Sequence, residues 1–511
     1  MKTKLRRSRL LKAAIAAVSA LLIVGFAFGQ SGIAVAGAPA SPGATTNVNA
    51  QTANDSESFQ SLNGFMWFYN SYFSYKFSTI TSQLGELKSD GVRVLGFFVP
   101  YEGNNSLCDG CDPVDYYKTN PASGSIQDWD TLVRTAHSKG MKVVAYFVNI
   151  YMDASSPWFL KAQQEYAAGD RTSPEVASID WTTDPTSPKP TLVSGPPFES
   201  EWTWSPIAKA YYWQLWFGPG VDFDLPGAQE QIARVEEFWL NTGIDGFMWD
   251  VGKIDPRFQA AAVTIPATYT NTPKWLTFET SNSASASAYA GFGLTSWFNY
   301  QDDFDQTVND YYNIVNGVTN ADGLEAALKN VDYARSLGDT TYAWSLSDDD
   351  PDANLATHTY PSYGPNDSVE RVQEAALLAG AGVEYGAFEY DQWTHWSPTL
   401  RKNWDQVLET VNDNQALLPS ASRTRVSAGS DEDAYAMQRT STNGKQTALL
   451  IYNFHDTASD VTVDLTGTGI STHQTPKDLY NGGYGPKING TSYTVHLPAY
   501  GFTILQVSKG N

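Results

Sequence analysis

The sequence predicts a mixed α/β protein: a (β/α)8 TIM barrel with a subdomain inserted after the third strand and an antiparallel β-sandwich at the C-terminus. Three observations lead to this fold class. Short apolar runs alternate with amphipathic segments from residue 63 onward, the alternation breaks between about 151 and 226, and it stops after about 418. Alternating strands and helices require parallel pairing, which favours a barrel in a chain of 511 residues.

The N-terminus has the pattern of a secretory signal. Six basic residues lie in the first twelve positions, an apolar run covers about 13–28, and Ala34-Val35-Ala36 resembles a small-residue cleavage site. We expect residues 1–36 to be a signal peptide, with a membrane anchor as the alternative. Residues 37–57 have the composition of a flexible linker. The sequence after the signal has no second long apolar run, so we expect a secreted, soluble protein without a membrane partner.

The barrel is expected to occupy residues 58–417. Its strands are continuous apolar runs, as in 92–100, and its helices place apolar residues at helical spacing, as Ile80, Leu84 and Leu87 do. The predicted strands are 64–72, 92–100, 142–149, 243–251, 275–279, 341–346 and 382–388, and the predicted helices are 77–88, 126–139 and 228–241.

The two remaining regions differ from the barrel in pattern. Residues 151–226 are rich in Pro, Ser, Thr and Trp and are too long for an ordinary loop, so they are expected to form the inserted subdomain. Residues 418–511 contain alternating stretches at 447–452, 461–465, 493–497 and 502–507, which are typical of antiparallel strands. These strands predict the C-terminal β-sandwich.

The charge balance excludes some classes of partner. The formal net charge is −22, and it becomes −28 without residues 1–36, which hold six basic and no acidic residues. Such a surface repels phosphate backbones and anionic lipids, so nucleic-acid binding is not expected. The 16 Trp and 28 Tyr residues suit stacking on sugars, although large β-rich domains also bury many aromatic rings.

The two cysteines, Cys108 and Cys111, lie three residues apart in a Gly/Asn/Asp-rich stretch. In a secreted chain this spacing favours a local disulfide, with two free thiols as the alternative. A zinc site would need further ligands, and no His or other Cys is near in the sequence.

The run 243–251 ends in a single carboxylate, Asp250. Catalytic groups of barrel enzymes stand at the C-terminal ends of the strands, so Asp250 is a candidate for catalysis. Taken alone, an Asp after an apolar run more often caps the following segment.

Several short motifs follow one another between residues 63 and 508, and their order is informative. They are Tyr101-Glu102-Gly103, Asp112-Pro113-Val114-Asp115-Tyr116-Tyr117, Trp202-Thr203-Trp204, Tyr211-Tyr212-Trp213 and Asp222-Phe223-Asp224-Leu225. In this order the motifs resemble the α-amylase family, glycoside hydrolase family 13, and especially its oligosaccharide-cleaving α-glucosidase-like branch.

The resemblance implies a retaining mechanism with two carboxyl groups about 5 Å apart. Carried over by position, the nucleophile is Asp250, and the acid/base is Glu279 at the end of the next apolar run. A third acid corresponds to Asp349 in Ser347-Asp348-Asp349-Asp350, where the register could shift by one residue; a solvated loop or a cation site is the alternative. Asp112 matches the residue that hydrogen-bonds the sugar at the cleavage subsite.

The sequence departs from the family pattern at related positions. The Asp and Arg that pair beside the nucleophile in the family are Tyr146 and Met248 here. Loss of one partner alone would leave a buried charge uncompensated, at a cost of about 3–5 kcal/mol, whereas loss of both is physically consistent. Without the cation, the pKa of Asp250 should rise.

The family's two sugar-binding histidines are also replaced, by Tyr151 and Asp348. A site that hydrogen-bonds particular hydroxyls rejects sugars that lack them, so these changes predict an altered sugar preference. Tyr146, Tyr151 and Trp249 could stack on a sugar, with core packing as the alternative for Tyr146 and Trp249. Lys253 resembles a lysine on the leaving-group side, with a surface lysine as the alternative.

The sequence therefore predicts a secreted retaining α-glycoside hydrolase or transglycosylase that acts on oligo- or polysaccharides. The family's calcium-binding Asn is Ile150 here, so neither calcium nor another metal or cofactor is expected. The expected partner is the carbohydrate substrate, and the protein is expected to be a monomer. The alternative is an inactive family member that binds carbohydrate at the cell surface.

Overall fold

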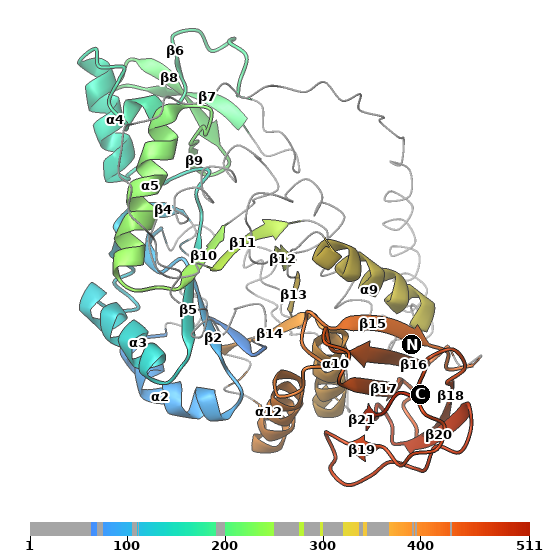
Figure 1. Cartoon of the computed structure of the whole chain (residues 1–511). Helices are drawn as coiled ribbons and strands as arrows, with labels where there is room; N and C mark the ends of the chain where they lie inside the picture. Colours follow the sequence, from blue (N-terminus) through green and yellow to red (C-terminus); the bar gives the residue numbers. More distant parts are fainter. Residues whose placement is uncertain are drawn as a thin grey trace, which may run out of the picture. The chain divides into compact units, whose positions relative to one another are not determined.

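The computed structural model describes residues 63–68, 75–104, 110, 112–190, 200–249, 275–280, 297–299, 320–336, 341–344, 367–390, 393, 396–429 and 432–510. Eight parallel strands form a closed barrel in the order β1-β14-β13-β12-β11-β10-β5-β2, because β1 pairs with both β14 and β2 (Figure 1). The strands are β1 (Phe65–Phe68), β2 (Val94–Phe98), β5 (Lys142–Phe147), β10 (Gly246–Trp249), β11 (Trp275–Thr280), β12 (Trp297–Asn299), β13 (Thr341–Trp344) and β14 (Glu384–Glu389).

Helices separate many of these strands along the chain. They are α2 (Phe77–Ser89), α3 (Ile126–Ser138), α5 (Pro226–Asn241), α9 (Ala321–Ser336), α10 (Asp367–Ala381) and α12 (Pro398–Asn412). The start of α3 is fixed by a capping box, in which Ser125 Oγ accepts from Asp128 N at 3.2 Å and Asp128 Oδ2 accepts from Ser125 N at 2.9 Å. The mixed α/β architecture is confirmed; segments outside the described residues separate other strands, so a helix after every strand stays a prediction.

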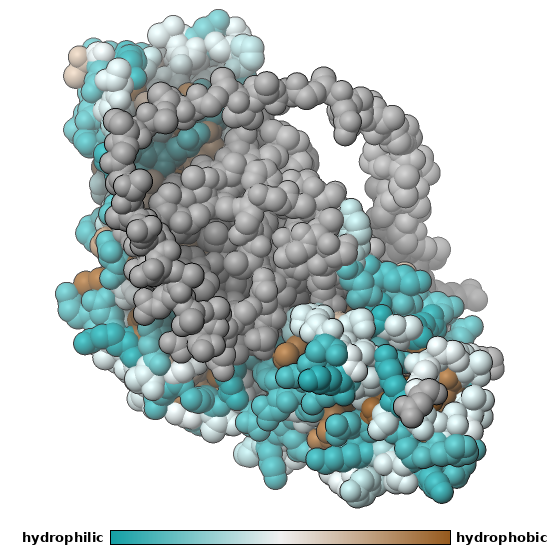
Figure 2. Space-filling model, in the orientation of Figure 1, coloured by the Kyte–Doolittle hydropathy of each residue, from teal (hydrophilic) through white to brown (hydrophobic). Residues whose placement is uncertain are grey.

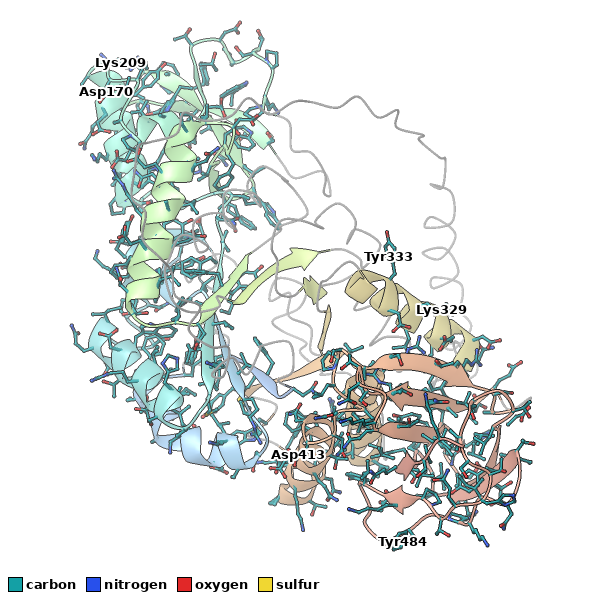
Figure 3. All side chains as sticks on the ribbon, viewed as in Figure 1. Asp170, Lys209, Lys329, Tyr333, Asp413 and Tyr484 are labelled. Atoms are coloured by element: carbon teal, nitrogen blue, oxygen red, sulfur yellow. The ribbon has the colours of Figure 1, made fainter. Side chains whose placement is uncertain are left out.

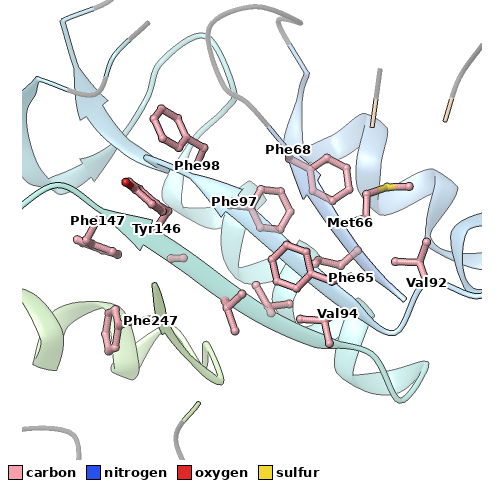
Figure 4. Packing of buried hydrophobic residues seen from close by; sticks show 14 of the residues in the cluster. Phe65, Met66, Phe68, Val92, Val94, Phe97, Phe98, Tyr146, Phe147 and Phe247 are labelled. Carbon is pink, nitrogen blue, oxygen red and sulfur yellow. The ribbon is translucent and has the colours of Figure 1, made fainter. Parts of the chain in front are cut away.

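Large aromatic side chains fill the space between the barrel strands and their covering helices. Trp129 of α3 meets Phe97 edge to face with ring centroids 5.0 Å apart, and it meets Trp239 of α5 at 5.5 Å. Phe147 packs on Phe247 of the next strand at 5.4 Å (Figure 4). Such edge-to-face pairs add to the free energy of burial and hold each helix against its strands.

A buried carboxylate joins the neighbouring barrel strands β5 and β10. Asp245 precedes β10, and its Oδ2 accepts from Val143 N at 2.9 Å while its own N–H donates to Val143 O at 2.7 Å. His137 Nε2 of α3 lies 2.7 Å from the same carboxylate oxygen. These contacts set how β10 lies along β5, and thus which residues face each other at the other end of the strands.

The chain between β5 and α5 forms a helix and a small antiparallel sheet. In this sheet β8 pairs with β6, β7 and β9. The elements are α4 (Pro157–Ala167), the 3-10 helix η3 (Val176–Ser178), β6 (Trp181–Thr182), β7 (Ser200–Ser205), β8 (Ala210–Leu215) and β9 (Gly218–Pro219).

Two antiparallel sheets follow the last barrel helix and share one apolar cluster, which includes Leu449, Ile451, Val461 and Val495. Their strands are β15 (Ser422–Val426), β16 (Ala434–Thr440), β17 (Thr447–Asn453), β18 (Ser459–Asp464), β19 (Lys477–Asp478), β20 (Ser492–Leu497) and β21 (Phe502–Val507). The predicted antiparallel strands are therefore confirmed.

Two local expectations differ from the structure. Strand β12 was not predicted, because its three residues are too short to give a pattern. The motif from Asp112 to Tyr117 was not predicted as a strand either, but from Pro113 onward it lies in β4 (Pro113–Thr119), which pairs with β3 (Tyr101–Gly103). The alternation of exposed and buried aromatic residues in β4 suits a short hairpin.

The described part of the chain holds no helix that is both long and apolar enough to cross a membrane. Figure 2 shows hydrophobic residues on this face only as small, separate groups among hydrophilic ones.

Helix α5 carries a buried carboxyl group that we expect to make stability depend on pH. Glu236 is fully buried, and neither carboxyl oxygen has a hydrogen-bond partner among the residues that the structure describes. Burial raises its pKa well above the ordinary value of 4.5, so the folded protein keeps a proton that the unfolded chain releases. The free energy of unfolding should fall by up to about 1.4 kcal/mol per pH unit as the pH rises above that value, until the group ionises in the folded state.

The Glu236→Gln variant should lack this part of the pH dependence, and its stability relative to wild type should grow with pH. The measurement is urea unfolding between pH 5 and 8, where the range follows from ordinary carboxyl pKa values of about 4. Glu237→Gln, at the exposed neighbouring position, is the matched control. Parallel curves for wild type and Glu236→Gln would contradict the prediction.

Candidate active site

Several predicted site positions are neighbours across the sheet at the carboxyl ends of β5, β10 and β11. In the strand register Met248 lies opposite Tyr146 on one side and Thr277 on the other. The next residue of β10, Trp249, lies opposite Phe278, and Glu279 follows Phe278 within β11. The two positions at which the family's ion pair is replaced are therefore direct neighbours across the sheet.

Tyr146 lies in an aromatic environment. It is 6% exposed, and its ring centroid is 4.9 Å from that of Phe98 on β2 (Figure 4). In register, Phe98 pairs with Tyr146, which pairs with Met248. An uncharged row of residues thus occupies the positions beside the predicted nucleophile.

Asp112 has a buried carboxyl group. It directly precedes β4, its backbone carbonyl accepts from Asn104 N at 2.9 Å, and the residue is 1% exposed. Neither side-chain oxygen has a partner at normal hydrogen-bond geometry within the described part of the chain, although the Asp153 carboxyl group is close enough to affect its pKa. Burial, together with the neighbouring carboxylate of Asp153, raises the pKa of Asp112 to about 8. At neutral pH Asp112 is therefore protonated, with the Asp153 carboxylate as the neighbour that favours its proton, and a ligand hydroxyl could hydrogen-bond to the same carboxyl group.

Asp153 is the charged member of this pair. Burial alone would raise its pKa, but hydrogen bonds from Ser155 N at 2.6 Å, Ser155 Oγ at 2.5 Å and Asn104 Nδ2 at 2.8 Å lower it instead. The proton therefore resides on Asp112 and the negative charge on Asp153, because only Asp153 has donors to stabilise the charge.

Tyr151 lies beneath the turn between β8 and β9. It is 1% exposed, and its ring is 6.1 Å from Trp216 and 6.0 Å from Phe217. Gly218 follows in close approach: a Cβ there would lie 1.9 Å from Met152 O and 3.6 Å from Asp112 Oδ1. Only glycine fits this position, and it brings the turn against both Tyr151 and Asp112.

Trp216 is a candidate site residue that the sequence did not indicate. It is 38% exposed, it stacks on Phe217 at 5.1 Å, and its φ is +57°. A bulky residue in this region is rare and costs on the order of 1–3 kcal/mol, and such strain tends to occur at functional sites. The Gly218-Pro219-Gly220 run after β8 marks a turn, but the conformation of Trp216 depends on tertiary contacts.

Replacing Trp216 by alanine should raise KM about tenfold with little change in kcat, which corresponds to the loss of one ring stacked on a sugar at about 1.4 kcal/mol. The measurement is steady-state kinetics on a hydrolysed oligosaccharide. Trp204→Ala is the matched control, because Trp204 is 50% exposed on β7 of the same sheet.

Trp216→Gly separates binding from folding, because glycine accepts a positive φ without strain. This variant should keep or gain stability and still show the raised KM. An unchanged KM in Trp216→Gly would show that the side chain serves only the packing of the turn.

The other predicted site residues are described less fully. Asp250, Lys253, Asp348 and Asp349 lie outside the described residues, as do Cys108 and Cys111, while Trp249 and Glu279 are described by their backbone alone. Within the described part of the chain, no group of three His, Cys, Asp or Glu side chains could hold a metal ion.

Comparison with known proteins shows where the chain has relatives. The model of the α-amylase catalytic domain matches residues 68–312, a range that includes Asp112, Asp250 and Glu279 but not Asp349. A trehalose synthase of Thermus thermophilus is 33% identical over 177 residues, which are 34% of this chain and 17% of that enzyme. α-Amylase 3 of Dictyoglomus thermophilum is 30% identical over 146 residues, 28% of this chain and 26% of that enzyme. The matched segments thus span well under a third of these two relatives.

The fold extends beyond the matched segment. The solved structure of Eubacterium rectale Amy13B superposes with a TM-score of 0.64 at 16% identity, and the match covers 88% of this chain and 96% of that one. Similarity at this identity shows a common fold. The chain is therefore similar to the α-amylase catalytic domain over residues 68–312, and it shares the fold of a solved structure over most of its length.

Proposed function

We propose that this protein is a secreted retaining α-glycoside hydrolase or transglycosylase that acts on oligo- or polysaccharides, with a sugar preference unlike that for ordinary glucosides. In this proposal Asp250 attacks the anomeric carbon and Glu279 first protonates the leaving oxygen, then activates water or a sugar acceptor. Asp349 holds the substrate and stabilises the positive charge of the transition state. The match of residues 68–312 to the α-amylase catalytic domain supports this reaction class.

The observation that carries the proposal is the register of β10 and β11. Trp249 and Phe278 are opposite each other, and they are the residues that directly precede Asp250 and Glu279. Neighbouring strands are about 4.8 Å apart. This spacing agrees with the separation of about 5–5.5 Å that retaining glycosidases require between their carboxyl groups. In this proposal both acids stand at the carboxyl ends of barrel strands, where the catalytic groups of such barrels are found.

The surroundings of these acids support an altered substrate preference. Tyr146, directly opposite Met248, stands where the family has an acid. Asp112 is a protonated donor beside the turn of Trp216 and Gly218. A pocket with uncharged and aromatic groups in place of an ion pair and imidazoles should select a different pattern of sugar hydroxyls.

The same replacements favour one alternative, a catalytically inactive protein that binds carbohydrate at the cell surface. Without the family's Arg at position 248, Asp250 lacks a cation to keep it ionised, and a protonated Asp250 would be a poor nucleophile. The two functions differ in one respect that can be measured directly, namely whether a glycosidic bond is broken.

Hydrolysis of a broad panel tests the proposal. The panel should contain α-glucosides, sucrose-like disaccharides and pentofuranosides, and proton NMR should follow the anomeric configuration of the first product. We expect cleavage with retention and a preference for a substrate other than a simple α-glucoside. Cleavage of ordinary α-glucosides alone, at rates typical of glycosidases, would refute the altered preference. Binding of glycans without any cleavage would refute the enzyme and support the alternative.

A further inference from the structure

A second pocket lies outside the candidate active site, between two barrel helices and the C-terminal sheets. Its volume is about 330 Å³, at the lower end of the range of about 300–1,000 Å³ for small-molecule sites. The first two turns of α10 and α12 form one wall, with Val372, Leu400 and Asn403. The turn after β19, with Tyr480, and the start of β21, with Phe502, form the other.

The walls of this pocket are joined by hydrogen bonds. Gln373 of α10, which is fully buried, donates to Asn453 O at 2.7 Å and to Gly501 O at 3.1 Å. Gln406 of α12 donates to Tyr480 O at 2.6 Å. Since both helices hold the turns that line the pocket, the pocket exists before a ligand binds, and little ordering is needed on binding.

The lining is uncharged, in a chain with a formal net charge of −22, and it combines a larger apolar surface with a few hydroxyl and amide groups. The Tyr480 ring packs against Phe502 with centroids 4.7 Å apart, which makes an aromatic surface. The side chains of Thr399 and Asn403 and the hydroxyl of Tyr480 form no hydrogen bond with another described residue, so they are available to a ligand. Tyr500, in the same wall, has a φ of +49°, an uncommon conformation for a tyrosine.

These features select a class of ligand. An ion would find no countercharge here, and a lipid or an apolar side chain would leave the hydroxyl and amide groups unsatisfied. A neutral sugar has an apolar face for an aromatic ring and hydroxyls for amide and hydroxyl partners. We propose that this pocket is a non-catalytic binding site for a short neutral oligosaccharide. The proposal does not depend on catalysis at Asp250.

The pocket lies toward the end of the barrel that carries the candidate active site, so a bound sugar chain would be held near that site. Helices of a parallel barrel begin near the carboxyl ends of the strands, so the first turns of α10 and α12 lie toward the end of the barrel that carries the candidate active site. A polysaccharide held in the pocket would remain near that end between catalytic events, which raises the local concentration of substrate.

Hydrogen exchange measured by mass spectrometry tests the proposal on the full chain with Glu279→Gln, so that sugars are not consumed. Maltotriose, isomaltotriose and raffinose are the neutral probes, and trigalacturonic acid is the charged one. At least one neutral probe should protect peptides that cover 398–403 and 480–502, and trigalacturonic acid should not. Absence of protection by all three neutral probes, or protection by the charged probe alone, would overturn the proposal.

Variants identify the residues that bind. Tyr480→Ala should lower the affinity for the protecting oligosaccharide about tenfold, because a stacked ring is lost. Asn403→Ala should lower the same affinity about fivefold, because one hydrogen bond is lost. Tyr484→Ala is the matched control, because this tyrosine is 75% exposed at the edge of the C-terminal sheets and outside the pocket (Figure 3). Equal affinities in Tyr480→Ala and Tyr484→Ala would refute the site even if the protein proves to be an active glycosidase. Weakening in Tyr480→Ala alone would support it even if no glycosidic bond is cleaved.

Discussion

Replacing Asp250 by asparagine should lower kcat at least about 10⁴-fold, the scale expected when the nucleophile of a covalent mechanism is removed. Asparagine has the shape of aspartate but cannot form the glycosyl-enzyme ester. Substrate binding should change little, because the amide keeps the volume and one acceptor oxygen. Single-turnover kinetics with the best substrate of the panel measures the effect.

A matched control for this variant is Asp255→Asn, which removes a carboxylate five residues further along the chain. It should leave kcat within about threefold, as expected for a group that takes no part in the reaction. If Asp250→Asn and Asp255→Asn retained the same activity, the assignment of the nucleophile would be wrong.

The second large effect concerns Asp112. Replacement by alanine should lower kcat/KM about 10²- to 10³-fold, as for the loss of one preorganised donor in an active site. The physical reason is that Asp112 is buried and protonated and that neither of its oxygens has a well-formed hydrogen bond to another described residue, so a substrate hydroxyl can bond to it.

The role of Asp112 as a hydrogen-bond donor should also make kcat/KM depend on pH. Because the pKa of Asp112 in the free protein is about 8, the carboxyl donates a hydrogen bond below that pH and loses its proton above it. The value of kcat/KM should therefore fall about tenfold per pH unit above about pH 8. Asp112→Asn, whose amide donates at every pH, should show no such fall. Asp153→Asn should move it to lower pH, because removing the adjacent negative charge lowers the pKa of Asp112. A fall that persists unchanged in Asp112→Asn would belong to another group.

Much of the barrel could be predicted because its strands and helices carry local signals. The helix predicted at 77–88 is observed as Phe77–Ser89, and the helix at 126–139 as Ile126–Ser138, where Ser125 and Asp128 form the cap. Helix α10 gave no such signal. Its residues from Glu370 onward are buried on all sides, and they include Arg371, Gln373 and Glu374, so the pattern has no polar face. Burial all round removes the periodicity on which sequence prediction depends.

The candidate site could be predicted only in part, for a similar reason. Sequence order was sufficient to suggest that Tyr146 and Met248 replace a pair, and the register confirms that they are neighbours. Two features could not be predicted: the left-handed conformation of Trp216, and the fact that Asp112 rather than Asp153 holds the proton. Each depends on contacts between segments far apart in the sequence, such as Gly218 against Met152 or Asn104 on Asp153.

Covalent labelling tests the proposed mechanism most directly. The protein is incubated with an activated fluoro-sugar or a cyclitol epoxide and digested, and the peptides are sequenced by mass spectrometry. We expect one equivalent of label, attached to Asp250, with loss of activity in proportion to labelling. A label on a different carboxylate, or inversion of configuration without any label, would contradict the assignment of Asp250 as the nucleophile of a retaining glycosidase.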